Sequence, residues 1–228
     1  MDTIKRMAGL RERKKQQTRR HISDVATGLF CQRGFEAVTV AEIAEAADVS
    51  VNTVYNYFPT KEGLFFDRED EVVSRLARRV RERAVGESAA EAVLRGIRED
   101  ILAKEPTAGL TEHYGEFLRV VFNSPTLTAY LMRMQRSMGI ALAEVLREEA
   151  GAGPGDRIPD LIAGQLVWVQ SYVYRIAGEF RGAATLDERV AHMLETLEAA
   201  EYLLSDRVLG YARRPPGRAP RPEGPTPP

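Results

Sequence analysis

Residues 39–61 read TVAEIAEAADVSVNTVYNYFPTK, and this stretch carries the signals of two short helices joined by a tight turn. Thr39 and the glutamate three residues later have the spacing of a capping box, in which each side chain bonds the other residue's backbone N–H. Asp48 tolerates the left-handed backbone that ends a helix. Ser50 suits the N-cap of the second helix, and Phe58 ends it because a residue before proline is pushed out of the α region. A helix, a short turn and a second helix is the arrangement that places the second helix in a DNA major groove.

The second helix, residues 51–57, has two different faces when its residues are placed 100° apart. Val54 and Phe58 lie one turn apart and are expected to face the core, whereas Asn52 and Asn56 point in nearly the opposite direction. Amide and hydroxyl groups on such a face can hydrogen-bond base edges and phosphates. The alternative is an ordinary pair of helices with a solvated polar face, because helix-turn-helix patterns also arise by chance.

A further helix is predicted before this stretch, over residues 18–33, and it ends at Gly34. Its apolar residues have the spacing of one buried helix face, and they are Ile22, Val25, Ala26, Leu29 and Phe30. After the second short helix, Thr60 can cap another. Three helices can therefore share a small core before residue 65.

In these residues the chain resembles the tetracycline-repressor (TetR) family of transcriptional regulators. The resemblance rests on four features: the blocks LFCQRGFEAVTV, IAEAADVSVNTVYNYF and PTKEGLF, and a long helical remainder. It covers about the first 65 residues, and beyond them only the helical character and the length agree. Asp48 departs from the family, which usually has glycine there, but aspartate can adopt the required backbone.

The resemblance implies contacts with DNA phosphates for Thr39, Thr53, Tyr57 and Lys61. Two of these contacts also make physical sense, because Thr39 and Lys61 lie at helix N-termini, whose free N–H groups favour an anion.

The resemblance implies contacts with DNA bases for Val51, Asn52 and Tyr55. Because of its direction on the helix, Asn52 is the better base reader, and Val51 contacts at most a thymine methyl group. Asn56 also faces outward and is added to the set.

The charge of the chain is unevenly placed, although the net charge of the 228 residues is only −1. Residues 1–20 carry eight Lys and Arg against two acidic residues, which gives +6. Residues 62–206 carry 17 basic and 25 acidic residues, which gives −8. A basic end on an acidic body orients a molecule toward DNA. We expect residues 1–17 to form a basic, partly disordered arm. The alternative to a role in DNA binding is that this arm is only solvated, and both can hold because such arms often become ordered on the phosphate backbone.

The composition favours the cytoplasm. The first 20 residues contain no apolar segment of a secretory signal, and no stretch approaches the roughly 18 apolar residues that a membrane span needs. Cys31 is the single cysteine, so no internal disulfide is expected. We expect no membrane partner.

From residue 66 the pattern stays helical, so the predicted fold is all-α: a three-helix DNA-binding domain over residues 18–65, then a larger helical effector-binding and dimerisation domain over 66–211. The expected helices are 60–84, 88–104, 111–122, 125–150, 159–181 and 185–211. Residues 212–228 are rich in Pro and Arg and predict a disordered tail, because so few apolar residues cannot offset the ordering entropy.

The last two helices predict a homodimer, because each carries more than one apolar stripe and so needs a partner besides its own core. The expected interface residues are Ile162, Leu166, Val169, Val173, Ile176 and Phe180 on the first helix, and Met193, Leu197 and Leu204 on the last. A second stripe beside the first holds Leu161, Gln165, Trp168, Tyr172 and Arg175. The alternative is that both stripes are buried inside one monomer.

The resemblance also implies a small molecule that enters the helical body and changes the separation of two DNA-binding units. The candidate ligand residues are the large or polar side chains on otherwise apolar helices: Tyr114, Phe117, Phe122, Met134, Met138, Trp168, Tyr172 and Arg175. Each is individually more typical of a core. Arg175 is the most informative, because an arginine there needs solvent, a carboxylate or an anionic ligand.

Enzymatic motifs are absent: the chain has no G-x-S-x-G, P-loop, H-E-x-x-H or paired-cysteine motif. His113 and Glu116 have the spacing of one helix face, but a surface pair is the better interpretation than a metal site. We expect no enzymatic activity, no cofactor and no metal.

The sequence therefore predicts a cytoplasmic, homodimeric repressor that binds a palindromic operator in double-stranded DNA and is released by a small hydrophobic effector. The alternatives are a DNA-binding activator or architectural protein without an effector and, more remotely, a helical enzyme with a DNA-binding head.

Overall fold

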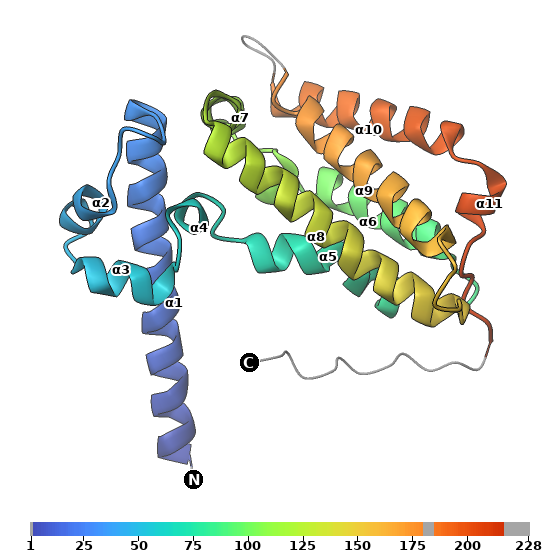
Figure 1. Ribbon diagram of the computed structural model, residues 1–228, viewed down its shortest axis with the longest axis horizontal. Helices are drawn as coiled ribbons and strands as arrows, with labels where there is room; N and C mark the ends of the chain where they lie inside the picture. The colour runs from blue at the N-terminus through green and yellow to red at the C-terminus, as the bar shows by residue number, and fades with distance from the viewer. Residues whose placement is uncertain (1, 180–184, 217–228) are drawn as a thin grey trace. The chain divides into compact units, whose positions relative to one another are not determined.

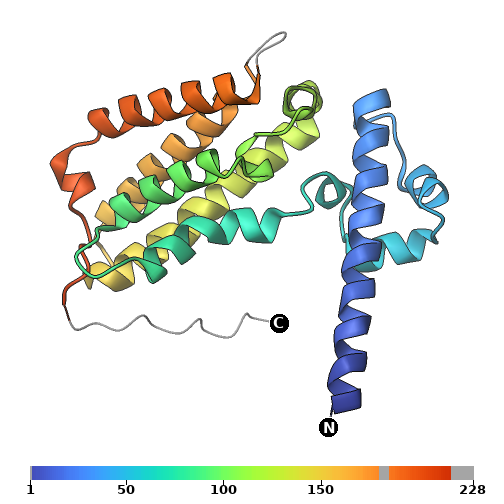
Figure 2. The ribbon, with the colours of Figure 1, turned by 180° about the vertical axis from the view of Figure 1, so that it is seen from behind.

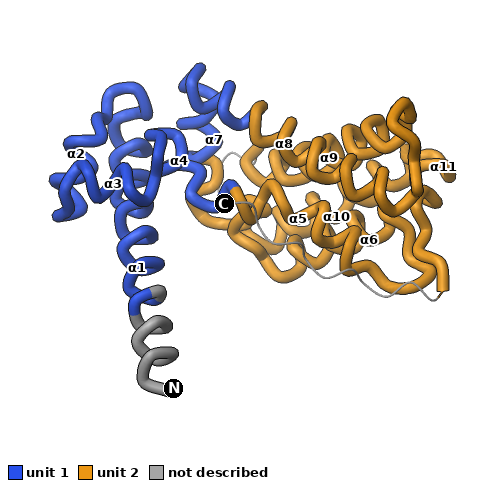
Figure 3. Tube along the Cα trace, turned by 60° about the horizontal axis from the view of Figure 1, so that its bottom comes forward, with its two compact units in different colours: residues 1–69, 116–131 blue, residues 70–115, 132–228 orange. Residues whose placement is uncertain are grey.

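The computed structural model describes residues 2–179 and 185–216, and these residues form helices and no strand, which confirms the all-α prediction. The chain divides into two compact units (Figure 3). The first unit comprises residues 1–69 and 116–131, and the second comprises residues 70–115 and 132–228. The predicted domain bounds of 18–65 and 66–211 stay a prediction.

The first unit packs four N-terminal helices around a small aromatic core. These are α1 (Asp2–Arg33), α2 (Val40–Ala46), α3 (Val51–Tyr57) and α4 (Lys61–Phe65). Helix α1 contacts α2 and α4, and α2 contacts α3 (Figures 1 and 2). Ile22, Ala26 and Phe30 of α1 are fully buried, as predicted, and the Phe30 ring packs on Phe35 with 4.9 Å between ring centroids.

Helix α1 begins at Asp2 and not near Thr18, so residues 2–17 are helical where composition predicted a partly disordered arm. The Thr18 hydroxyl donates to the Lys14 carbonyl at 3.0 Å, so Thr18 lies in the interior of the helix and not at its start. Residues 10–20 are mostly Leu, Arg, Glu, Lys and Gln, which are good helix formers. The helix that the core stabilises can therefore extend backward through them.

The long helix predicted over residues 60–84 is wrong, because the chain leaves the helical path after α4 and α5 (Glu69–Glu82) starts a new helix. Two contacts explain the break. The Phe66 ring is buried and stacks on Tyr130, with 5.2 Å between centroids. The Asp67 carbonyl accepts a hydrogen bond from the Arg19 guanidinium at 2.7 Å. Both partners lie far away in sequence, so the local pattern does not reveal the break.

The rest of the first unit comes from later in the chain. It contains most of α7 (Tyr114–Asn123) and the start of α8 (Pro125–Ala150). The Phe117 ring stacks on Phe65 with 4.5 Å between centroids. The Ser124 hydroxyl donates to a Glu36 carboxylate oxygen at 2.6 Å.

The second unit is a helical bundle with one continuous apolar core. It contains α5, α6 (Ala89–Leu102), a 3₁₀ turn (Pro106–Ala108), the remainder of α8, α9 (Ile158–Ile176), α10 (Leu186–Leu203) and α11 (Asp206–Leu209). Helices α6, α9 and α10 contact one another, and Figure 1 shows α9 and α10 side by side. No described helix combines the length and the apolar character needed to cross a membrane.

The final helix predicted over 185–211 is interrupted after α10, because Leu204 is extended and α11 then turns toward α6. The segment that follows is packed, contrary to the disordered tail expected from residue 212. Arg214 is buried, its N–H donates to the Glu87 carbonyl, and its carbonyl accepts from Gly86 N–H. We call residues 209–214 with the α5–α6 corner, residues 83–91, the C-terminal clasp. The remainder of the predicted tail, 217–228, lies outside the described residues.

Candidate nucleic-acid interface

Local capping interactions build the turn between α2 and α3 as predicted. The Glu42 N–H donates to the Thr39 hydroxyl at 3.3 Å, and the Thr39 N–H donates to the Glu42 carboxylate at 2.8 Å, which completes the capping box. Asp48 adopts the left-handed backbone with φ of 52°. The Ser50 hydroxyl accepts from the Thr53 N–H at 3.0 Å and so caps α3. The predicted turn and both caps are confirmed.

Helix α3 divides into the two predicted faces. Val54 is fully buried and Phe58 is 2% exposed, so this side attaches the helix to the unit. The exposed side chains are Val51, Asn52, Tyr55 and Asn56. Two amides and a phenol therefore face solvent on a helix about 10 Å long at about 1.5 Å per residue, a size that fits a major groove.

The predicted phosphate-binding hydroxyls differ in how free they are. Thr39 is exposed, but its hydroxyl already takes part in the capping box. Thr53 is half-buried, and its hydroxyl hydrogen-bonds the Ser50 hydroxyl at 2.8 Å. Tyr57 is half-buried at the end of α3. Their contacts with phosphate stay predictions.

Lys61 already contacts Phe35 within its own unit. Its Nζ donates to the Phe35 carbonyl at 2.6 Å and lies 4.3 Å from the centroid of the Phe35 ring. Desolvation by burial lowers the pKa of the Lys61 ammonium below its ordinary value. An ammonium has three N–H donors, so Lys61 can hold this loop while donating to a phosphate.

Arg19 is a residue whose role the sequence did not reveal, since we counted it only as part of a basic run. Its guanidinium donates to the Tyr57 carbonyl at 2.9 Å, and the same group donates to the Asp67 carbonyl. It also lies over the Phe58 ring, 4.4 Å from the centroid. Arg19 therefore caps the C-terminal end of α3 and fixes its position against α1.

The remaining basic residues of the described part of α1 point into solvent. They are Arg11, Arg13, Lys14, Lys15 and Arg20, together with Arg33, which pairs with Glu42. A helix that carries them in a fixed arrangement supplies positive charge for contacts with phosphates.

The predicted dimer interface on α9 and α10 is wrong in its choice of face. Ile162, Leu166, Val169, Val173 and Ile176 are all at least nine-tenths buried inside the chain, as are Met193 and Leu197. Leu204 is half-buried, and Phe180 lies outside the described residues. The stripe was assigned to a partner because α9 has apolar residues on several sides, but this stripe packs on the unit's own core. The exposed stripe is the neighbouring one, where Leu161 is 65% and Trp168 is 58% exposed.

The eight candidate ligand residues occupy different environments. Phe117 belongs to the aromatic core of the first unit, and Phe122, in the same unit, is exposed. Met134 and Met138 are buried. Tyr114 is partly buried against the second unit's core, and burial raises its pKa to about 12.

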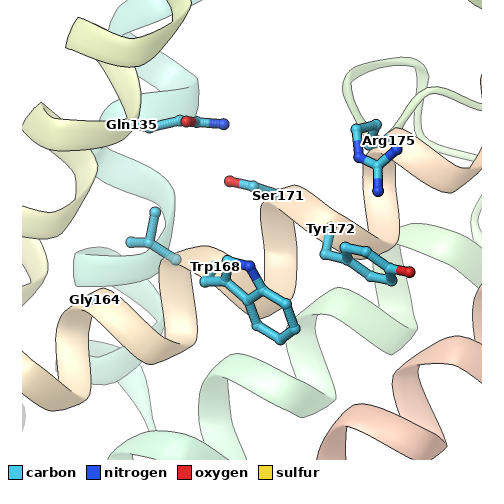
Figure 4. Close-up of a pocket in the computed structure, with 7 residues that line it drawn as sticks. Gln135, Gly164, Trp168, Ser171, Tyr172 and Arg175 are labelled. Carbon is cyan, nitrogen blue, oxygen red and sulfur yellow. The ribbon is translucent and has the colours of Figure 1, made fainter.

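Trp168, Tyr172 and Arg175 do come together on α9. They line a surface pocket of about 320 Å³ with Gln135 of α8 and Gly164, Val167 and Ser171 of α9 (Figure 4). The Trp168 and Tyr172 rings stack with 5.3 Å between centroids, and the Arg175 guanidinium lies 4.9 Å from the Tyr172 centroid. Arg175 also forms an ion pair with Glu179 and is half-buried, so solvent and a carboxylate already satisfy its charge.

A metal site at His113 and Glu116 would require both residues to lie on one helix face, and the structure does not show this. Helix α7 begins at Tyr114, so His113 precedes it and the two residues do not share a helix face. The described residues contain no cluster of three or more His, Cys, Asp or Glu that could hold a metal ion.

Comparison with known proteins agrees with this geometry. Residues 22–67 match the family of bacterial regulatory proteins, tetR family. The transcriptional regulator MftR of Mycobacterium tuberculosis is 26% identical over 165 residues, which cover 71% of this chain and 80% of MftR. The transcriptional repressor KstR of Rhodococcus jostii is 43% identical over 47 residues, 21% of this chain and 22% of KstR.

Among solved structures, the SmeT–triclosan complex resembles this chain in fold, with a TM-score of 0.55 and 17% identity over 91% of this chain and 99% of the SmeT chain. The family match, the regulators that share it and the all-helical fold identify the chain as a transcriptional regulator of the TetR family.

Proposed function

We propose that this regulator is a homodimeric repressor that binds a palindromic operator in the cytoplasm and is released by a small hydrophobic effector. The observation that carries the proposal is α3, whose exposed face of Asn52, Tyr55 and Asn56 stands on a buried face of Val54 and Phe58. One helix of this length makes few base contacts, so two symmetric copies on two half-sites are needed for specificity.

The exposed stripe of α9 supports a second copy of the chain as the partner. Ile158, Leu161, Trp168 and Tyr172 form an apolar surface along this helix, and Tyr202 and Leu203 are exposed near the end of α10. Apolar surface gathered on one face marks an interaction site, and two such helix pairs can form a four-helix bundle.

The surface pocket on α9 supports binding of a small molecule by the second unit. Its volume of about 320 Å³ lies at the lower end of the range for ligand sites. Aromatic walls with a few polar groups, as in this pocket, suit a mostly apolar compound.

The test is selection of double-stranded DNA from a random pool by the purified protein, combined with sedimentation of the free protein. We expect an inverted repeat of two short half-sites and a dimer at micromolar concentration. Enrichment of a single half-site by a monomeric protein contradicts the proposal.

A further inference from the structure

A largely buried polar centre lies in the second unit. It is formed by Arg75 and Arg79 of α5, Asp100 of α6 and Tyr174 of α9, and the side chains of Arg79 and Asp100 are 15% exposed. Arg79 Nη2 lies 2.6 Å from Asp100 Oδ1, and Arg75 Nη1 lies 3.2 Å from Asp100 Oδ2. The Tyr174 hydroxyl donates to Asp100 Oδ2 at 2.5 Å. Burial and the charge of Asp100 raise the pKa of the Tyr174 phenol, so it stays a donor. We call these four residues the polar centre.

The two guanidinium groups of the polar centre do not have equal partners: Arg75 pairs with Asp100 and Glu71, whereas Arg79 pairs with Asp100 alone. Two guanidinium groups share the single carboxylate of Asp100, and the second carboxylate, Glu71, reaches Arg75 from a side chain that is 38% exposed. Asp100 uses both of its oxygens for these partners.

Two buried atoms in this part of the unit have no hydrogen-bond partner. One is Arg79 Nη1, and the other is Oε1 of Gln170, which precedes Tyr174 by one turn of α9. A buried donor on a charged group that bonds nothing is costly and rare in folded proteins.

The arginines of the second unit differ in how fully they are bonded: Arg189 and Arg214 each leave a buried Nε without a partner, Arg79 leaves a terminal Nη1, and Arg83 leaves none. Arg83 is 1% exposed; its guanidinium donates to the carbonyls of Val80, Glu87 and Ala212 and pairs with Glu149 at 2.8 Å. Arg79 is different, and the neighbouring helix accommodates it: a Cβ at Gly96 of α6 would lie only 2.3 Å from Arg79 Nε. The absence of a side chain at Gly96 thus leaves the space that the Arg79 guanidinium occupies.

We propose that the polar centre recognises the carboxylate of an effector, with one carboxylate oxygen accepting a hydrogen bond from Arg79 Nη1. A single unpaired N–H, on a guanidinium that shares its carboxylate with Arg75, matches one carboxylate oxygen. This inference rests on the proposed effector-released function. It makes Arg79 the partner of the effector's anionic group, in place of Arg175, which already pairs with Glu179.

The test uses acetate as the probe, because acetate carries the recognised group and needs no particular hydrocarbon body. The Nε–H resonance of Arg79 in the full-length protein, assigned with Arg79→Gln, is followed by NMR. We expect a saturable shift with sodium acetate and none with acetamide or with sodium chloride at equal ionic strength. Equal responses to acetate and chloride overturn the proposal.

Two variants and a control separate recognition from folding. Arg79→Gln removes the guanidinium, whereas Gly96→Ala keeps it but displaces it. Both should weaken acetate binding about tenfold or more, the loss expected for one charge-assisted hydrogen bond. Arg95→Gln, which removes an exposed ion-paired arginine of α6, should leave it unchanged. Gly96→Ala with parental acetate affinity contradicts the proposal even if Arg79→Gln fails to fold.

Operator binding is measured separately, without any probe, so that failure of the repressor function is recognised by itself. We then expect carboxylates between butyrate and decanoate to release the selected DNA, and their matched alcohols to do so at least about tenfold less well. Acetate binding without DNA release by any member of the series overturns the effector role.

Discussion

Helices α3 and α9 both present aromatic side chains to solvent, but on different backgrounds. On α3 the exposed Tyr55 stands between two asparagines, whereas on α9 the exposed Trp168 and Tyr172 continue an apolar stripe that includes Leu161. A polar surface with amides suits a hydrated, hydrogen-bonding partner such as DNA. An apolar surface of the same kind of helix suits another protein surface. We therefore expect different partners for these two exposed faces.

The largest expected effect comes from introducing an aspartate on α9, first on its buried side and then on its exposed side. Val173→Asp puts a carboxylate where the side chain is fully buried, and an uncompensated buried charge costs about 3–5 kcal/mol. We expect a large drop in the thermal midpoint measured by circular dichroism. If the variant kept its thermal midpoint but became monomeric, the buried stripe that contains Val173 would again be the candidate dimer interface.

Leu161→Asp, on the outer stripe, should leave folding intact because Leu161 is 65% exposed. We expect the dimer to weaken by about 2 kcal/mol or more if this residue lies at the centre of the interface. Sedimentation equilibrium measures the change, and Glu198→Asp on α10 serves as an exposed control. An unchanged dimer would separate the apolar stripe of α9 from assembly.

On α3, Asn52→Ala should cost about 1–3 kcal/mol of affinity for the selected operator and little for random DNA. The control is Asn123→Ala, which removes an exposed amide at the end of α7 in the same unit. Fluorescence anisotropy with both DNAs gives the two affinities. Equal losses on operator and random DNA would mean that Asn52 contacts the backbone and not a base.

Arg19→Gln tests whether the two faces of α3 depend on an anchor outside the helix. It removes the cation over Phe58 and the bonds to the Tyr57 and Asp67 carbonyls, so we expect about 1.5–3 kcal/mol lower stability of the first unit. The neighbouring exposed Arg20→Gln should leave stability nearly unchanged and instead lower the salt dependence of DNA binding. Equal melting curves for the two variants would contradict the anchoring role.

The smallest expected effect concerns the cap of α2 at low pH. Hydrogen bonds from the Thr39 backbone and hydroxyl, and then Arg33, lower the pKa of Glu42 from 4.5 to about 2. A lowered folded-state pKa gives a contribution that is present above pH 4.5 and is lost as pH falls toward 2. The side-chain carboxyl carbon resonance of Glu42 should titrate near 2 in the parent and closer to 4.5 in Thr39→Ala.

The parts of the fold that the sequence predicted correctly depend on neighbours along the chain. The caps at Thr39 and Ser50, the left-handed Asp48 and the inward Val54 all follow from interactions within four residues. Helix α3 has a single apolar side, so its faces were unambiguous.

The parts that failed depend on distant partners. The break after α4 needs Arg19 and Tyr130, and the turn after α10 needs contacts with α6. On α9 apolar residues surround most of the helix, so periodicity could not distinguish the side that packs on the chain's own core. The anchoring role of Arg19 was hidden in a run of basic residues, where composition gives charge but no contact.

The C-terminal clasp joins residues that are very far apart in sequence: Ser88 to Leu209, Arg83 to Ala212 and Arg83 to Arg214, with separations of 121 to 131 residues. Closing a loop of this length costs entropy before the contacts repay it. We therefore expect the α5–α6 corner to be completed after the helices between have assembled. The Gly86 and Ala89 amides, which donate to Arg214 and Tyr211, would exchange their hydrogens during any partial opening that frees this end of the chain.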